Sequence, residues 1–131
     1  MKRLLFVCVE NASRSQMAEA FATRYGKGKI EAFSAGTMPS SEVNPVVIEA
    51  MKEKEFDLSK NRLKTIDTHM VRKADAVIVM GCGAQGFCPA PMLQKVEDWE
   101  LEDPKGKTIE RVREIRDEIE RKVKQLIAKL S

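Results

Sequence analysis

The segment that most constrains the fold is an apolar run that leads into a polar loop and then into an amphipathic run. Residues 4–8 are short and apolar, which is typical of a buried parallel strand. From Ser15 onward apolar residues recur at helical spacing, and Gly26 follows as a stop signal. Ser13 with Gln16 has the form of a capping box at the start of this helix. The chain therefore begins with a strand–loop–helix unit.

Strand-like and helix-like segments continue to alternate along the rest of the chain. We expect further strands at residues 30–34, 76–80 and 94–98, and helices at residues 45–52, 62–71 and 109–130. This alternation predicts an α/β fold, with a four-stranded parallel sheet flanked by helices on both faces. The length of 131 residues fits a single domain over residues 1–131.

Three loops follow expected strands, and ligands of parallel sheets bind beyond the carboxyl ends of the strands. These loops begin at Cys8, at the glycine-rich stretch 81–91 and at residues 101–107. We therefore expect the three loops to converge on one rim of the sheet.

The composition excludes several classes of function. A net charge of +3, from 23 basic and 20 acidic residues, suits a small anionic substrate and lacks the strong basic excess of a nucleic-acid-binding protein. No apolar run approaches a membrane span, and residues 1–3 lead into a strand instead of a signal-peptide core. Three cysteines, an odd number, disfavour a secreted disulfide framework. We expect a cytoplasmic monomer that binds neither nucleic acid nor membranes.

Cys8 and Arg14 enclose the first loop in the pattern Cys-x5-Arg-Ser, and we call residues 8–14 the oxyanion loop. Such a loop can wrap its inward-pointing N–H groups around a tetrahedral oxyanion, next to the positive end of the following helix. That environment favours a Cys8 thiolate as the nucleophile, with Arg14 holding two oxygens of the anion. A buried structural cysteine and a solvated arginine are the alternatives, and they leave the joint pattern unexplained.

Asn11, Ser13 and Ser15 are candidates to support the oxyanion loop. Asn11 lies in the middle of the loop, where one residue needs a positive φ, and asparagine tolerates this conformation. Ser15 is placed to donate a hydrogen bond to the Cys8 thiolate, with a simple helix cap as the alternative. We assign these residues to support of the loop and not to reaction.

Asp103 is the candidate acid of the site. Pro104 restricts the aspartate before it to an extended backbone, and a carboxylic acid there can protonate a departing oxygen. Asp98, Glu100 and Glu102 compete for the same role, and an acidic turn without a chemical role is the other alternative.

Cys82 and Cys88 lie in the glycine-rich loop 81–91. A cysteine on such a loop can reach a sulfur on Cys8 and then swing outward, as thiol–disulfide exchange requires. Two unrelated thiols are one alternative. A metal site with Cys8 and His69 is another, which the spacing and the single histidine disfavour. We therefore expect a redox role for this pair, with no metal and no cofactor.

Together these features resemble the thioredoxin-coupled arsenate reductases, which share the low-molecular-weight protein tyrosine phosphatase fold. The similarity covers almost the full chain, and its motifs are Cys8-x5-Arg14-Ser15-Gln16-Met17-Ala18-Glu19, Ser34-Ala35-Gly36-Thr37, Asn44-Pro45, Met80-Gly81-Cys82 with Cys88-Pro89, and Asp103-Pro104. The Cys82/Cys88 pair distinguishes reductase from phosphatase. Phosphatases of this fold typically carry an aromatic residue after the Asp-Pro pair, where this chain has Lys105, which favours a small inorganic oxyanion.

The resemblance implies reduction of arsenate to arsenite, with phosphate and sulfate as competing anions. Cys8 would attack arsenate while Asp103 protonates the leaving oxygen. Cys82 would then attack Cys8, so that two electrons pass to arsenic, and Cys88 would attack Cys82. Thioredoxin would reduce the resulting disulfide, with glutaredoxin or another dithiol as the alternative donor. The competing functions are a low-molecular-weight protein tyrosine phosphatase acting through a Cys8 phosphocysteine, and a non-catalytic protein that binds arsenite or a soft metal.

Some members of this group bind potassium near the loop through an asparagine, a glutamate, a serine and an aspartate. Asn11, Glu19 and Ser34 match the first three, and Lys64 stands where the aspartate is expected. A lysine cannot ligate a cation, but its ammonium can take the place of one. We therefore predict that this protein does not depend on potassium.

Overall fold

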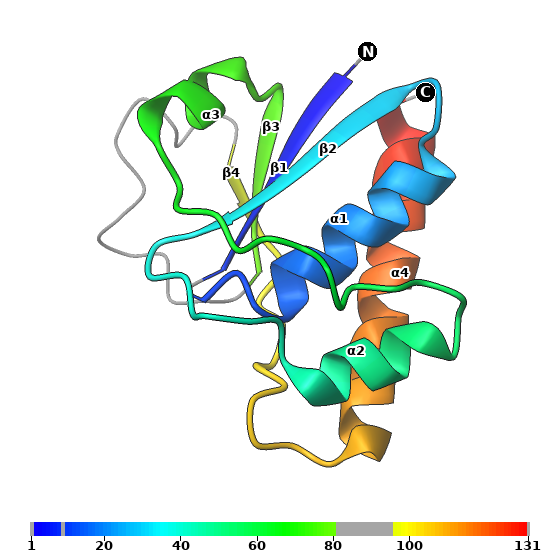
Figure 1. Cartoon of the computed structure of the whole chain (residues 1–131). Helices are drawn as coiled ribbons and strands as arrows, with labels where there is room; N and C mark the ends of the chain where they lie inside the picture. Colours follow the sequence, from blue (N-terminus) through cyan, green and yellow to red (C-terminus); the bar gives the residue numbers. More distant parts are fainter. Residues whose placement is uncertain (1, 9, 81–95, 131) are drawn as a thin grey trace.

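The computed structural model describes residues 2–8, 10–80 and 96–130 of the chain. Within these residues the strands form one sheet, in the order β2-β1-β3-β4, and all neighbours are parallel (Figure 1). Its strands are β1 (Lys2–Cys8), β2 (Ile30–Gly36), β3 (Ala76–Val79) and β4 (Val96–Asp98). Of the strand expected at residues 94–98, the described residues 96–98 form β4.

Helices cover both faces of the sheet, as predicted, so the α/β class is confirmed (Figure 1). The helices are α1 (Arg14–Tyr25), α2 (Pro45–Lys52), α3 (Thr68–Lys73) and α4 (Ile109–Leu130). The larger core lies between the sheet and α1, α2 and α4, whereas α3 packs on the opposite face. Among the helices of the described residues, none is long and apolar enough to cross a membrane.

Strand β1 is buried on both sides because its residues alternate between the two cores. Leu4, Phe6 and Cys8 face the larger core, and Leu5 and Val7 face the core beneath α3. Each of these side chains is at most 1% exposed. The period of two in strand side chains accounts for this division. Cys8 therefore ends the strand on the same side of the sheet as α1.

The order of the strands places the carboxyl end of β1 at a switch point of the sheet. β1 has β2 on one side and β3 on the other, so the chain leaves β1 in one direction and returns on the other side. Ligands of open α/β sheets bind at such points. Cys8 is the last residue of β1, and α1 begins six residues later at Arg14.

Helix α4 anchors α1 and α2 against the sheet. Its buried apolar residues fall three or four positions apart and therefore form one face: Val112, Ile115, Ile119, Val123 and Ile127. The buried Arg116 of this helix donates a hydrogen bond to Ala50 O of α2 at 2.8 Å. Helix α1, which follows the oxyanion loop, is therefore supported by its packing against α4.

The predicted helix at residues 62–71 is wrong over most of its length, because α3 begins only at residue 68. The preceding residues pair with the end of β2: the Gly36 N–H donates to Lys64 O at 2.7 Å, and the Gly36 carbonyl accepts from Ile66 N at 2.9 Å. The side chain of Asp67 then caps α3. Non-local pairing with Gly36 prevails over the local helical pattern.

The two ends of α1 differ from the sequence expectation. Ser13 is the N-cap residue but makes no side-chain cap hydrogen bond, so the predicted capping box is wrong. Gln16 instead donates to Asn11 Oδ1 at 3.2 Å. Gly26 does end the helix, with φ of −101°. A Cβ at this position would lie 2.6 Å from Ile30 Cβ, so the close approach of the next strand requires glycine.

Candidate active site

Cys8 is buried beside two polar side chains of the residues that follow it. Its Sγ lies 2.9 Å from Ser15 Oγ, and Asn11 Nδ2 donates to the same Ser15 oxygen at 2.8 Å. Because Ser15 Oγ already accepts a hydrogen bond from Asn11, its own hydrogen is available to the sulfur. A hydroxyl that donates to sulfur stabilises the negative charge of a thiolate. The local geometry therefore suits a nucleophilic Cys8.

The oxyanion loop turns at Asn11, whose φ is 53°, so the predicted positive φ is confirmed. The carbonyl of Glu10 accepts from Ser40 N at 3.0 Å, and the carbonyl of Ala12 accepts from Asn44 N at 2.9 Å. Both carbonyls are thus bound to a neighbouring segment of the chain. These two hydrogen bonds anchor the oxyanion loop to residues 40–44.

Arg14, the first residue of α1, is buried with its guanidinium fixed in place. Its Nη1 donates to Met80 O at 2.7 Å and to Leu101 O at 2.9 Å, and its Nη2 lies 3.8 Å from Asp103 Oδ2. Among the described side chains, Arg14 Nε is the one buried polar atom without a hydrogen-bond partner. An unpartnered buried donor costs about 1–3 kcal/mol, which an anion oxygen bound at Nε would relieve.

Asp103 lies opposite Arg14 and is half exposed. The backbone N–H of Lys105 donates to Asp103 Oδ1 at 3.0 Å, which fixes the orientation of the carboxyl group. The oxyanion loop and the loop at residues 101–107 therefore meet at one rim, as predicted. The third loop of that prediction, residues 81–91, lies outside the described residues.

The contacts of Glu102 distinguish it from Asp103 as a candidate acid. Arg111 Nη2 lies 2.6 Å from Glu102 Oε1, and the hydrogen bonds from Arg111 lower the pKa of Glu102 below its usual value. Glu100 lines a different pocket, together with Arg111 and Glu114. Asp103 is thus the carboxyl group that faces Arg14 among these described side chains.

Glu19, Ser34 and Lys64 form a polar cluster behind the oxyanion loop. Ser34 Oγ donates to Glu19 Oε1, and Lys64 Nζ lies 3.4 Å from the same oxygen. The backbone N–H of Lys64 donates to Asn11 Oδ1 at 2.8 Å, which connects the cluster to the loop. The Lys64 ammonium therefore lies where it can neutralise the charge of the Glu19 carboxylate.

We expect potassium and sodium at equal concentration to give the same melting temperature and activity, because the Lys64 ammonium already neutralises Glu19. Thermal melts in the two chloride salts test this. Lys64→Asp provides the matched comparison, since it removes the ammonium and adds a carboxylate near Glu19. This variant should melt higher in potassium than in sodium, whereas a reproducible potassium effect on the unmodified protein would contradict the prediction.

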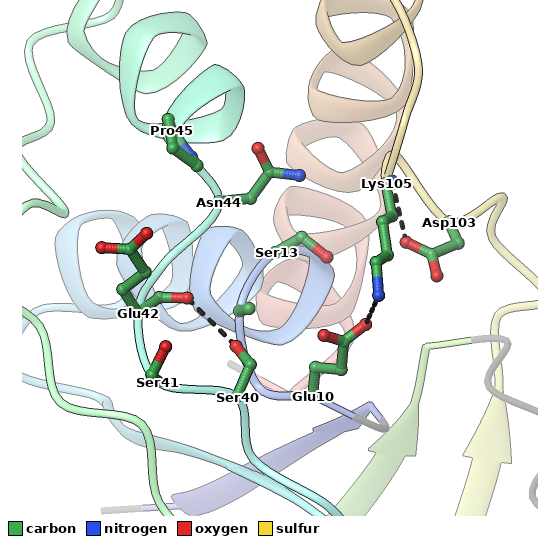
Figure 2. A pocket seen from close by; sticks show the side chains of 10 residues that line it. Glu10, Ser13, Ser40, Ser41, Glu42, Asn44, Pro45, Asp103 and Lys105 are labelled. Carbon is green, nitrogen blue, oxygen red and sulfur yellow. Dashed lines mark hydrogen bonds and ion pairs between the residues drawn. The ribbon is translucent and has the colours of Figure 1, made fainter.

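A pocket of about 320 Å³ opens beside the oxyanion loop (Figure 2). Ser13 lies on its wall, with its hydroxyl free of the capping role expected for it. The full lining comprises Glu10, Ala12, Ser13, Ser40, Ser41, Glu42, Asn44, Pro45, Asp103 and Lys105. Three separate segments of the chain therefore form its walls.

Cys82 and Cys88 fall within residues 81–95, outside the described part of the structure. Their predicted redox role therefore stays a prediction. Cys8 is a free cysteine and is buried.

Sequence reasoning missed several residues that build the site. The carbonyls of Met80 and Leu101 hold Arg14, and no residue type signals such an acceptor. Gln16 orients Asn11 and also donates to Arg62 O at 3.1 Å. Its place within the quoted Cys-x5-Arg-Ser-Gln motif was the available signal.

Comparison with known proteins identifies the family. Residues 3–131 match the family described as low molecular weight phosphotyrosine protein phosphatase, and the chain belongs to it. The glutaredoxin arsenate reductase of Synechocystis sp. is 41% identical over 133 residues, which cover 100% of this chain and 100% of that protein. A putative arsenate reductase of Halobacterium salinarum is 40% identical over 126 residues, which cover 92% of this chain and 87% of that protein.

Solved structures with this fold include reductases and a phosphatase. An arsenate reductase in the phosphate binding state has a TM-score of 0.90 and 40% identity, with 100% of both chains covered. An arginine phosphatase from Geobacillus stearothermophilus has a TM-score of 0.88 and 28% identity, covering 99% of this chain and 93% of that chain. A thioredoxin-dependent arsenate reductase of Corynebacterium glutamicum has a TM-score of 0.83 and 35% identity, covering 99% and 62%.

Proposed function

We propose that this protein is an arsenate reductase that converts arsenate to arsenite. The observation that carries the proposal is the guanidinium of Arg14, at the end of the oxyanion loop, which two carbonyls hold in place and whose Nε is buried without a partner. A buried, unpaired and oriented donor of this kind suits a tetrahedral oxyanion. The arsenate reductases among the relatives support arsenate as that anion.

In the first step, Cys8 Sγ attacks the arsenic of bound arsenate. Arg14 and the N–H groups of the oxyanion loop hold the other oxygens and stabilise the charge that develops on them. Asp103 donates a proton to the leaving oxygen, which departs as water. The product is a thiol ester of arsenate on Cys8, in which arsenic is still pentavalent.

In the second step, the Cys82 thiolate attacks Cys8 Sγ. The S–As bond breaks, its electron pair stays on arsenic, and arsenite leaves. Cys88 then attacks Cys82 in the new disulfide and frees Cys8. The net change is one arsenate and two thiols converted to one arsenite, one disulfide and one water, so atoms and electrons balance.

We propose thioredoxin as the reductant of the Cys82–Cys88 disulfide. Names among the relatives include both a glutaredoxin arsenate reductase and a thioredoxin-dependent one, so glutaredoxin is the competing donor. We further propose that the reaction takes place in the cytoplasm and that residues 1–131 form one domain.

Arsenate turnover with each donor system tests the proposal. The unmodified protein should cycle many times with thioredoxin, thioredoxin reductase and NADPH, and more slowly with glutaredoxin and glutathione. Cys8→Ser should be inactive, whereas Cys82→Ser and Cys88→Ser should lose multiple turnover with the thioredoxin system. If both of these variants keep cycling, the relay is wrong. Thermal melts of each variant establish that it folds.

The competing function is phosphomonoester hydrolysis, which is consistent with the description of the family. Cys8, Arg14 and Asp103 suffice for that reaction, and Cys82 and Cys88 have no part in it. An aryl phosphate assay separates the two functions. For a reductase, arsenate turnover depends on Cys82 and exceeds aryl phosphate hydrolysis, whereas a phosphatase shows the reverse order and is unaffected by Cys82→Ser.

A further inference from the structure

An ion pair connects two walls of the 320 Å³ pocket beside the oxyanion loop. Lys105 Nζ lies 3.2 Å from Glu10 Oε2, and Figure 2 shows the lysine side chain extended from its loop toward the glutamate. Glu10 belongs to the oxyanion loop, and Lys105 follows the Asp103-Pro104 pair. The two residues are 95 positions apart, so this contact joins segments that the fold alone brings together.

Glu10 is connected to both of the other walls of the pocket. Its backbone carbonyl accepts a hydrogen bond from Ser40 N at 3.0 Å, and its carboxylate accepts one from Lys105 Nζ. The Glu10 side chain is about one-third exposed, and that of Lys105 is 70% exposed. An exposed pair of this kind is weak and is screened by salt. The contact can therefore open without disturbing the core.

The ion pair lies in the same pocket as Asp103. The proposed function makes Asp103 the acid for the leaving oxygen, so any group attached to that oxygen extends into the space beside Asp103. Asp103 and Lys105 both line the pocket, and the Lys105–Glu10 contact crosses the gap between the loop of Asp103 and the oxyanion loop. In arsenate the leaving oxygen carries nothing larger than a proton, so the contact does not obstruct it.

We propose that the Glu10–Lys105 ion pair is a specificity clasp, which restricts the site to free inorganic oxyanions and disfavours esters. The proposal rests on the proposed function for the site, and it assigns Glu10 and Lys105 a role in substrate choice. Opening the clasp should admit a phosphate ester, whose organic group then occupies the pocket.

A phosphate ester reports on the clasp through a reaction that needs no reductant. The Cys8 sulfur takes the phosphoryl group, and the ester oxygen leaves as an alcohol with a proton from Asp103. Water then breaks the S–P bond and regenerates Cys8, with phosphate as the product. No atom changes oxidation state, so the assay is independent of Cys82, Cys88 and any donor.

The test compares kcat/KM for p-nitrophenyl phosphate with kcat/KM for arsenate in the same preparation. Lys105→Met and Glu10→Gln should each raise this ratio about two- to fivefold, the effect expected for an exposed pair. The Lys105 N–H that orients Asp103 is a backbone group, so Lys105→Met leaves it in place. Exchange of the charges, in the double variant E10K and K105E, should return the ratio toward that of the unmodified protein.

Lys107→Met is the matched control, because Lys107 lies on the same loop and its Nζ is 3.8 Å from Glu102, away from the pocket. This variant should leave the ratio unchanged. Sodium chloride should raise the ratio of the unmodified protein and have little effect on that of Lys105→Met.

Equal ratios in the unmodified protein, Lys105→Met and Glu10→Gln would overturn the clasp, as would a double variant that shows no recovery. If the protein does not reduce arsenate, the proposed function is overturned but the clasp is not. The variants can then be compared by kcat/KM for p-nitrophenyl phosphate and by the inhibition constant of inorganic phosphate.

Discussion

Replacement of Arg14 by lysine is expected to lower kcat/KM for arsenate by about 10²–10³-fold, the loss typical of a missing oxyanion donor. Lysine keeps the charge, but one ammonium cannot donate to Met80 O and Leu101 O and also present two donors to an anion. Inhibition by inorganic phosphate should weaken in parallel, since phosphate binds at the same donors. Steady-state kinetics with phosphate as competitor measures both effects.

Arg24→Lys is the matched control for this prediction. Arg24 also lies on α1 and also donates to two backbone carbonyls, Lys54 O at 3.2 Å and Glu55 O at 2.8 Å. Because it is exposed and remote from the oxyanion loop, its replacement should leave kcat/KM nearly unchanged. An Arg14→Lys variant as active as Arg24→Lys would contradict the role assigned to the guanidinium.

Replacement of Asn11 by alanine is expected to reduce the free energy of unfolding by about 2–4 kcal/mol. Alanine at a φ of 53° is strained by about 1–2 kcal/mol, and the hydrogen bonds of Asn11 with Ser15, Gln16 and Lys64 are lost. Urea denaturation measures the change. Asn11→Gly should relieve the strain but not restore the hydrogen bonds. Its free energy of unfolding should therefore lie between that of Asn11→Ala and that of the unmodified protein.

Asn11→Asp tests the orientation of Ser15 separately from stability. Aspartate cannot donate to Ser15 Oγ and instead accepts its hydrogen, which is then withdrawn from Cys8. Alkylation of Cys8 by iodoacetamide, measured with Cys82 and Cys88 replaced by serine, should slow about tenfold. Asn61→Ala is the control, because Asn61 is exposed and its side chain donates to the Gln16 side chain at 2.9 Å instead of to Asn11 or Ser15. An alkylation rate unaffected by Asn11→Asp would contradict the proposed hydrogen bond.

Local patterns in the sequence were sufficient to predict the features of the structure that depend on local geometry. The strand that ends at Cys8 follows from its apolar run, and the positive φ of Asn11 follows from its place in a short loop. The buried face of α4 follows from apolar residues at spacings of three and four. These elements also give the α/β class, because their alternation requires parallel strands.

Contacts between distant segments account for what the sequence did not reveal. Arg14 is held by carbonyls 66 and 87 positions away, and every residue has a carbonyl, so no residue type predicts these partners. The late start of α3 has a similar origin, because pairing with Gly36 occupies the backbone of the residues before it. The Glu10–Lys105 pair, 95 positions apart, likewise exists only through the fold.

The chemical state of the cysteines after a single reaction tests the central claim most directly. Fully reduced protein is mixed with one equivalent of arsenate without any donor, and the products are quantified as arsenite, free thiols and disulfide-linked peptides. We predict one arsenite per chain, the loss of two of the three thiols, and a disulfide between Cys82 and Cys88. Arsenate recovered unchanged with all three thiols intact would contradict the account.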